Sequence, residues 1–279
     1  MAYKSILTFL GSDAEADATL PGAIRLALSH DAHLSVHAMG IDMTPMGGFY
    51  MGASPIMLQE TLERAQIEAE AVEAHARRLL DQPPLRWGAE SAVVQFGGLP
   101  ALVGLRARFS DLVVQCRPYG AKALASQEAV IESALFEGQA AVMVLPQKPL
   151  TEEFGKRVMI AWNQSNEALS AVRRALPLLQ AAEWVSVVVV NPPVHSPERS
   201  DPGGLLTQML ARHGVRAEVS VLAKTLPRVS DILMRHMADL DASIMVMGAY
   251  GHSRLREAIL GGATRNVLEN AEHAIFLAH

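Results

Sequence analysis

The sequence predicts an α/β protein with two doubly wound domains, each built on a five-stranded parallel sheet. Two observations lead to this prediction: apolar segments alternate with helical ones, and both halves of the 279-residue chain have the same order of elements. Continuous apolar strands are typical of parallel sheets that helices cover on both faces. Because crossovers between parallel strands are right-handed, they give an open, doubly wound sheet.

Both halves open in the same way. Residues 6–10 form an apolar strand candidate, followed by a polar turn and a helical stretch. Residues 158–162 form the corresponding candidate, followed by a polar turn and a helix over 168–179. We therefore predict two diverged copies, at 1–147 and 155–279.

The remaining elements of the two copies also match in order. Each copy has a second strand, a strand trailed by a Tyr-Gly pair, and a short closing strand. These strand candidates are residues 33–39, 112–115 and 142–145 in the first copy, and 184–190, 244–247 and 274–277 in the second. Apolar residues at three- and four-residue steps mark helices over 62–79 and 229–240. The closing strands are expected to pair the copies as a pseudo-dimer.

Composition restricts the classes of function. The chain is 50% hydrophobic and 19% charged, and its net charge of −5 is spread along it, which excludes general disorder and argues against a nucleic-acid groove or a basic membrane surface. The single cysteine, Cys116, forbids an intramolecular disulfide. No apolar window reaches the ~18 residues that a membrane span needs, and the first apolar stretch is too short for a signal peptide. We expect a soluble, cytoplasmic protein.

The most specific pattern lies in the second copy. Gly248 follows a buried strand, at the sheet edge where such folds bind ligands, and a glycine there lets a ligand approach the backbone. After a short amphipathic stretch, Gly261 and Gly262 open a helix predicted over 263–270. The free N–H groups and the dipole of that helix suit a phosphate, and Thr264 adds a hydroxyl.

This segment resembles the nucleotide-binding signature of the universal stress protein family, Gly-x2-Gly-x9-Gly followed by Ser or Thr. The matched glycines are Gly248, Gly251 and Gly261, whereas Gly262 stands at the Ser or Thr position. Residues 160–165 look like the first strand and loop of the family. The resemblance covers the whole chain as a tandem pair. It implies an adenine nucleotide alpha hydrolase-like fold that binds ATP at the strand tips.

The resemblance also implies a role for each matched position. The nucleoside would contact Ala161, Asn163, Val190, Met247 and Gly248, and the phosphates would contact Gly251, Gly261, Gly262, Ala263 and Thr264. Asn163 replaces the aspartate that the family usually carries. Its amide can donate and accept hydrogen bonds but lacks the charge that helps to hold a metal, so the resemblance leaves Mg²⁺ beside ATP undecided.

The first copy departs from the signature. Pro118 has no N–H to offer, Ala129 and Val130 take the place of the glycine pair, and Gly11 stands where the second copy has Asn163. We predict that the N-terminal copy binds no ATP and acts as a scaffold.

Other candidate residues are interpreted as structural. His33 and His37 alternate along a strand, which gives no ready tetrahedral site, and we predict no metal site. Cys116 is expected to be buried at a strand end. The Met- and Gly-containing segment 41–55 is interpreted as a surface loop, with a ligand lid or a soft-metal site as alternatives. The segment 192–204 also reads as a loop.

Three classes of function follow. The first is a stress-response regulatory module that binds an adenine nucleotide in the second copy. The alternative is a structural or protein-interaction scaffold without nucleotide. The third is an enzyme, but the sequence has no Gly-x4-Gly-Lys-Ser/Thr loop and no Gly-x-Ser-x-Gly elbow, so we expect at most slow ATP hydrolysis. Protein partners are not specified, and a homodimer is compatible with the sequence.

Overall fold

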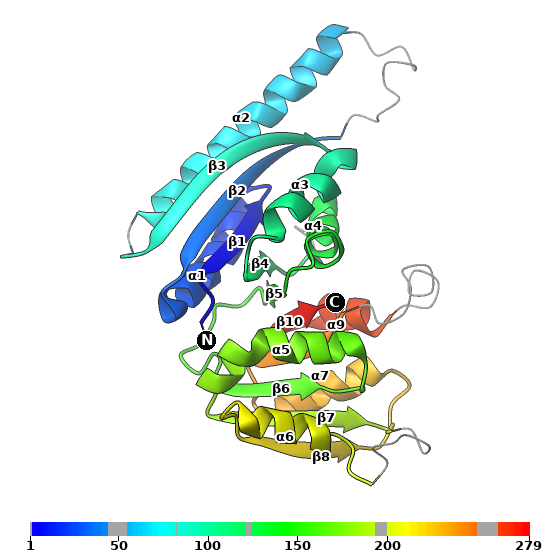
Figure 1. Ribbon diagram of the computed structural model, residues 1–279. Helices are drawn as coiled ribbons and strands as arrows, with labels where there is room; N and C mark the ends of the chain where they lie inside the picture. Colours follow the sequence, from blue (N-terminus) through cyan, green and yellow to red (C-terminus); the bar gives the residue numbers. More distant parts are fainter. Residues whose placement is uncertain (1, 44–54, 82, 121–123, 193–199, 250–261) are drawn as a thin grey trace. The chain divides into compact units, whose positions relative to one another are not determined.

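The computed structural model describes residues 2–43, 55–81, 83–120, 124–192, 200–249 and 262–279. The chain divides into two compact units, residues 2–147 (the N-terminal unit) and residues 148–279 (the C-terminal unit). Each unit has its own parallel sheet with helices on both faces (Figure 1).

The N-terminal unit alternates strands and helices along the chain. Its elements are β1 (Ser5–Leu10), α1 (Asp13–His30), β2 (His33–Asp42), α2 (Pro55–Leu80), β3 (Arg86–Gln95), the short 3₁₀ helix η1 (Phe96–Gly98), α3 (Leu99–Ala107), β4 (Leu112–Cys116), α4 (Ala125–Phe136) and β5 (Val142–Leu145). All its strands are parallel, in the order β3-β2-β1-β4-β5.

The C-terminal unit repeats this plan. Its elements are β6 (Arg157–Ala161), α5 (Asn166–Ala181), β7 (Trp184–Val190), α6 (Gly204–Arg212), β8 (Ala217–Leu222), α7 (Val229–Asp239), β9 (Ile244–Gly248), α9 (Ala263–Asn270) and β10 (Ala274–Ala278). The strands are again parallel, in the order β10-β9-β6-β7-β8. Both units are doubly wound, as the sequence predicts.

In each unit the order of strands reverses once. The reversal lies between β1 and β4 in the N-terminal unit and between β6 and β9 in the C-terminal unit. Open α/β sheets bind ligands outside the carboxyl ends of the strands at such a reversal. We call the carboxyl ends of β1 and β4 the N-terminal switch edge, and those of β6 and β9 the C-terminal switch edge.

The valine run of β7 shows how the apolar sequence becomes a sheet core. Val185, Val187, Val188 and Val189 are at most 3% exposed, since helices cover both faces of this strand. Burial of one such side chain contributes ~1.5–3 kcal/mol. By contrast, β3 and β8 are edge strands whose side chains are half-buried or exposed, and the sequence analysis assigned no residues to either of them.

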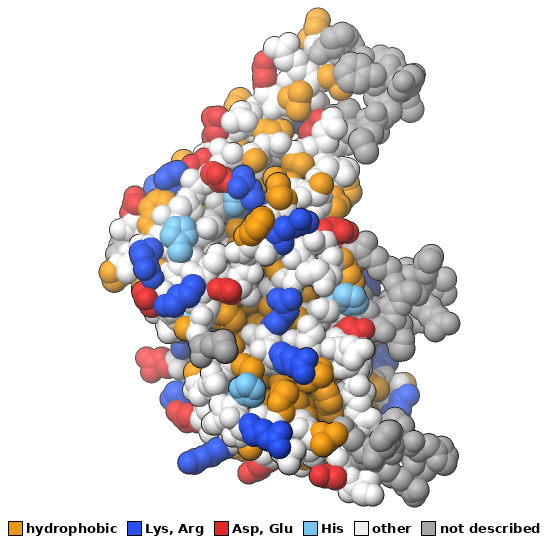
Figure 2. All heavy atoms as spheres, viewed as in Figure 1, with side chains coloured by type: hydrophobic (Ala, Val, Ile, Leu, Met, Phe, Trp, Pro, Cys, Tyr) orange, Lys and Arg blue, Asp and Glu red, His pale blue; other side chains and the backbone are white. Residues whose placement is uncertain are grey.

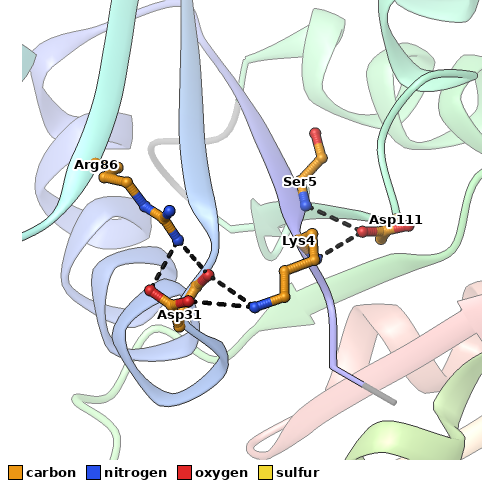
Figure 3. A network of polar contacts seen from close by, with 5 residues as sticks. All are labelled: Lys4, Ser5, Asp31, Arg86 and Asp111. Atoms are coloured by element: carbon orange, nitrogen blue, oxygen red, sulfur yellow. Dashed lines mark hydrogen bonds and ion pairs between the residues drawn. The ribbon is translucent and has the colours of Figure 1, made fainter.

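A polar network fixes the starts of the strands in the N-terminal unit (Figure 3). The backbone N–H groups of Lys4 and Ser5 donate to Asp111 Oδ2 at 2.7 and 3.0 Å. The Lys4 ammonium and the Arg86 guanidinium both pair with the Asp31 carboxylate, at 3.2 and 2.7 Å. These contacts lie at the opposite end of the sheet from the N-terminal switch edge.

Both predicted loop segments include residues that belong to helices or strands. Ile41 and Asp42 belong to β2, Pro55 begins α2 and Gly204 begins α6, while residues 44–54 and 193–199 lie outside the described part of the chain. Figure 2 shows Lys, Arg, Asp and Glu side chains mixed over the visible face. No helix in the described ranges is long and apolar enough to cross a membrane.

Candidate functional site

The C-terminal switch edge brings three strand ends together. Ala161, the last residue of β6, pairs with Met247 of β9, and β9 ends one residue later at Gly248. On its other side Ala161 pairs with Val188, so β7 continues two residues further, to Val190. The strand residues predicted to contact a nucleoside therefore end at one edge of the sheet.

Gly248 lies directly against the first turn of α5. A Cβ on this residue would come within 2.5 Å of Ala168 N and 2.7 Å of the Glu167 carbonyl carbon. No side chain fits into that space, because both neighbouring atoms belong to backbone. The sequence analysis assigned this glycine to the approach of a ligand; the structure adds that α5 itself requires it.

Asn163 is exposed in the turn that follows β6. Its Oδ1 accepts a hydrogen bond from Ser165 N at 3.1 Å, and Ser165 Oγ in turn accepts one from Ala168 N, also at 3.1 Å, which caps α5. The amide oxygen of Asn163 is thus used locally. Its Nδ2 group makes no hydrogen bond to any residue in the described ranges, so this donor is the group that Asn163 can offer at the edge.

The helix α9 begins at the residues predicted to hold phosphates. Gly262 is its N-cap, has no capping side chain, and no acidic residue follows in the first turn. Ala263 is exposed, whereas Thr264 is only 3% exposed and shares the buried face of α9 with Val267 and Leu268. The first backbone N–H groups of a helix have no partner within it. The amino end of α9 therefore offers backbone donors rather than the Thr264 hydroxyl.

Part of the predicted signature lies outside the described residues. Gly251, Gly261 and the arginines at 254 and 256 fall in the segment 250–261. Arg265, the third arginine of this region, forms an ion pair with Glu269 at 2.9 Å. Among the residues that the structure describes, no group of three His, Cys, Asp or Glu side chains could hold a metal ion.

Trp162 is a residue of this edge that the sequence analysis did not single out. It directly follows β6, is 8% exposed, and its backbone N–H donates to Val188 O at 2.9 Å. Within the described ranges its indole Nε1 is buried without a hydrogen-bond partner. A buried donor of this kind usually has a partner, so an acceptor beside the indole N–H would be stabilising.

The N-terminal switch edge has the same backbone plan with different side chains. The N–H of Arg117 bonds to the last residue of β5 as the N–H of Ala249 bonds to the last residue of β10. Cys116 therefore occupies the position that Gly248 occupies in the other unit. Cys116 is buried at the end of β4, as the sequence predicts, and burial raises its thiol pKa to about 11.

Glu15 fills this edge from the first turn of α1. Its N–H is capped by Ser12 Oγ at 3.2 Å, as Ala168 is capped in α5, so Glu15 stands where the C-terminal unit has an alanine. The side chain turns back, and Oε2 accepts a hydrogen bond from Gly11 N at 2.8 Å. Burial raises the pKa of this carboxyl to about 7, against smaller lowering effects from Gly11 and Gln127.

The start of α4 corrects one detail of the sequence analysis. The N-cap of α4 is Leu124, so Leu124 is the counterpart of Gly262. Ala129 and Val130 lie in the second turn of the helix, where they cannot replace a glycine pair at its amino end. The side chain that approaches this edge from α4 is that of Leu124, whose Cδ1 lies 3.3 Å from where a Cβ of Gly11 would stand.

Comparisons with known proteins agree with this architecture. Residues 155–279 match the model of the Universal stress protein family. A universal stress protein from Archaeoglobus fulgidus DSM 4304 is similar over 98% of this chain and 95% of its own, at 12% identity and a TM-score of 0.68. A functionally unknown protein from Pseudomonas aeruginosa PAO1 is similar over 99% of this chain and 92% of its own, at 14% identity and a TM-score of 0.63. A universal stress protein in complex with cAMP covers 44% of this chain and 97% of its own, at 17% identity and a TM-score of 0.35.

No curated protein matches the sequence. The fold and the two switch edges define an α/β protein of two doubly wound units. Its C-terminal unit, over residues 155–279, matches the model of the universal stress protein family, in agreement with the resemblance seen in the sequence.

Proposed function

We propose that the C-terminal unit is a regulatory module that binds ATP at the C-terminal switch edge. The observation that supports this most is the amino end of α9, where Gly262 provides no cap and no acidic residue lies in the first turn. Uncapped helix amides and the positive end of the helix dipole attract phosphate groups. The backbone N–H groups of Gly262 and Ala263, together with Thr264 and the signature residues Gly251 and Gly261, are proposed to hold the triphosphate.

The strand ends are proposed to hold the nucleoside. Ala161, Val190 and Met247 offer apolar contacts for the adenine and ribose, and Asn163 Nδ2 offers a hydrogen-bond donor. Gly248 lies beside these residues and has no side chain that would obstruct the nucleoside. Because the amide oxygen of Asn163 already accepts from Ser165, we expect this side chain to act toward the nucleotide as a donor.

Asn163 and the amino end of α9 bear on whether ATP binding needs Mg²⁺. Asn163 is neutral where the family usually has an aspartate, so it adds no negative charge to hold Mg²⁺. Backbone amides and a helix dipole bind phosphate without a metal. We therefore propose that ATP binds with at most a weak dependence on Mg²⁺.

The N-terminal unit is proposed to bind no ATP. The Glu15 carboxyl accepts the N–H of Gly11 at the N-terminal switch edge, and Leu124 stands where the C-terminal unit has Gly262. When it is ionised, this carboxyl would repel a phosphate. The first copy would then serve as a scaffold for the second.

Regulation follows from differential binding. A nucleotide that contacts both the start of α9 and the strand ends binds more tightly when these parts are held together than when they are apart. Binding therefore shifts the population toward the arrangement in which they are held together. A protein partner that contacts the same surface would then bind with a different affinity when ATP is present.

A matched pair of substitutions tests the binding site. The φ of Gly262 is −58°, so other residues fit its backbone. Gly262→Asp places a carboxylate at the proposed phosphate site and is expected to weaken ATP binding at least tenfold in calorimetry, about 1.4 kcal/mol. Gly262→Ala adds neither a charge nor a capping group and is expected to keep the affinity within a few-fold. Equal affinities for the two variants would contradict the proposal.

The alternative function is a scaffold that binds no nucleotide. The buried Thr264 and the replacement of the usual aspartate by Asn163 favour it. A ligand at a hundred times its Kd stabilises a protein by about 2.7 kcal/mol, which a thermal melt detects readily. An unchanged melting temperature in millimolar ATP would support the scaffold.

A further inference from the structure

The N-terminal switch edge holds a buried carboxyl among groups from three elements. Glu15 of α1 is 6% exposed, Cys116 of β4 is 6% exposed, and Gln127 of α4 is 6% exposed. Gln127 connects them: its Oε1 accepts from Leu124 N at 3.3 Å, and its Nε2 donates to Cys116 Sγ at 3.6 Å. The amide of Gln127 also acts on the Glu15 carboxyl.

No positive charge in the described part of the chain balances this carboxyl. The groups that act on its charge are the Gly11 N–H, the Gln127 amide and the Cys116 thiol, and no described Lys, Arg or His pairs with it. A buried carboxylate without a basic partner is costly, whereas a protonated acid can stay buried with its hydrogen bonds. The burial of Glu15 therefore favours its neutral form.

We propose that the N-terminal switch edge is a proton-operated switch, in which protonated Glu15 holds the start of α1, the end of β4 and the start of α4 together, and ionised Glu15 loosens them. In the neutral form the carboxyl keeps its bond to Gly11 and needs no hydration. In the ionised form it must either stay buried at a cost or draw water into the edge. Opening of this edge exposes Cys116, the next group inward.

The pH range follows from the direction of the pKa shift. The pKa of Glu15 is about 7 in the folded unit, above that of an unfolded glutamate, so the folded unit holds the proton over a range where the unfolded chain has lost it. The closed edge is therefore fully favoured below about pH 4.5. It loses stability as the pH rises toward 7, and the loss is constant above that.

Cys116 is the sole cysteine of the chain and gives a direct readout. The rate at which iodoacetamide alkylates it is measured from pH 5 to 9, without nucleotide, in the wild type and in Glu15→Gln. The wild-type rate is divided by the Glu15→Gln rate at the same pH. The pH dependence that comes from ionisation of the exposed Cys116 thiol is common to both rates and cancels in this ratio. The ratio of wild type to Glu15→Gln is expected to rise at least tenfold, with its midpoint near pH 7. Glu60→Gln, which removes an exposed carboxyl from α2, is expected to match the wild type at every pH.

A ratio that does not change with pH would overturn the proposal. If Glu15→Gln does not fold, the wild type alone decides the question through the hydrogen-exchange protection of the Gly11 amide. A protection factor that falls as the pH rises from 5 to 7 and is then constant supports the switch, and a protection factor that is constant from pH 5 to 9 contradicts it. Since no ATP is used, these results do not depend on the proposed nucleotide site.

Discussion

At the scale of single residues, the two units differ most at one matched pair of positions. The C-terminal unit has Gly248 at the end of β9 and Ala168 in the first turn of α5, and their backbones are in contact. The N-terminal unit has Cys116 and Glu15 at these positions, and their side chains fill the corresponding space. At this pair of positions, the C-terminal unit has backbone against backbone where the N-terminal unit has two side chains.

The first prediction concerns Gly248. In Gly248→Ala the new methyl group would overlap Ala168 N, so α5 and β9 must move apart. We expect a loss of about 1–3 kcal/mol in the free energy of unfolding by urea, the range that overpacking a core usually costs. Gly88→Ala is the control, because a Cβ there meets nothing closer than 3.7 Å. Similar losses in both variants would show that close approach does not explain Gly248.

The second prediction concerns Asn163. Asn163→Asp keeps an oxygen that can accept from Ser165 N and adds the negative charge that the family usually has at this position. We expect the affinity for ATP to become strongly dependent on Mg²⁺, rising at least fivefold when the metal is added and falling below that of the wild type without it. Calorimetric titration with and without Mg²⁺ measures both values. An unchanged response to the metal would contradict the proposed link between the neutral side chain at position 163 and the weak dependence on Mg²⁺.

At the scale of elements, the amino ends of the helices differ in a way that matches the proposed function. Ser12 caps α1 and Ser165 caps α5, each with a side-chain oxygen, and both helices have acidic residues in their first turns. Neither feature is found at the start of α9. Caps and acidic residues satisfy the amides and the dipole of a helix internally. Of these three helices, α9 is the one whose amino end is suited to bind an external anion.

The central strands and long helices could be predicted because burial leaves a clear pattern in the sequence. The run at 184–190 and the predicted helix over 263–270 match β7 and α9 in the structure. The edge strands β3 and β8 were not located, since half-exposed strands carry mixed side chains without a continuous apolar run. A weak pattern of this kind is hard to separate from a loop.

The candidate site was only partly predictable for a related reason. Spacing identified Gly248 and Gly262 as ends of elements, but the contact between Gly248 and α5 depends on residues about eighty positions apart. The role of Glu15 was missed because an acidic residue in a first helical turn is ordinarily an exposed partner of the helix dipole. Its burial depends on Cys116 and Gln127, which the chain brings close only when the sheet is formed.

At the scale of the whole molecule, the proposed function assigns nucleotide to one unit only. Each unit has its own sheet and its own buried core, so a ligand in the C-terminal unit is expected to raise the stability of that unit first. With ATP at a hundred times its Kd, amides of the core strands β6, β7 and β9 should exchange up to about a hundredfold more slowly, the equivalent of about 2.7 kcal/mol. Core amides in residues 2–147 should keep their rates. Hydrogen exchange read by mass spectrometry measures both units in one sample. In Gly262→Asp, whose Kd is expected to be at least tenfold higher, the slowing at the same ATP concentration should be about tenfold or less. Protection in β1 and β4 without protection in β6 and β9 would assign the nucleotide to the N-terminal unit. This result would contradict the roles proposed for the two copies.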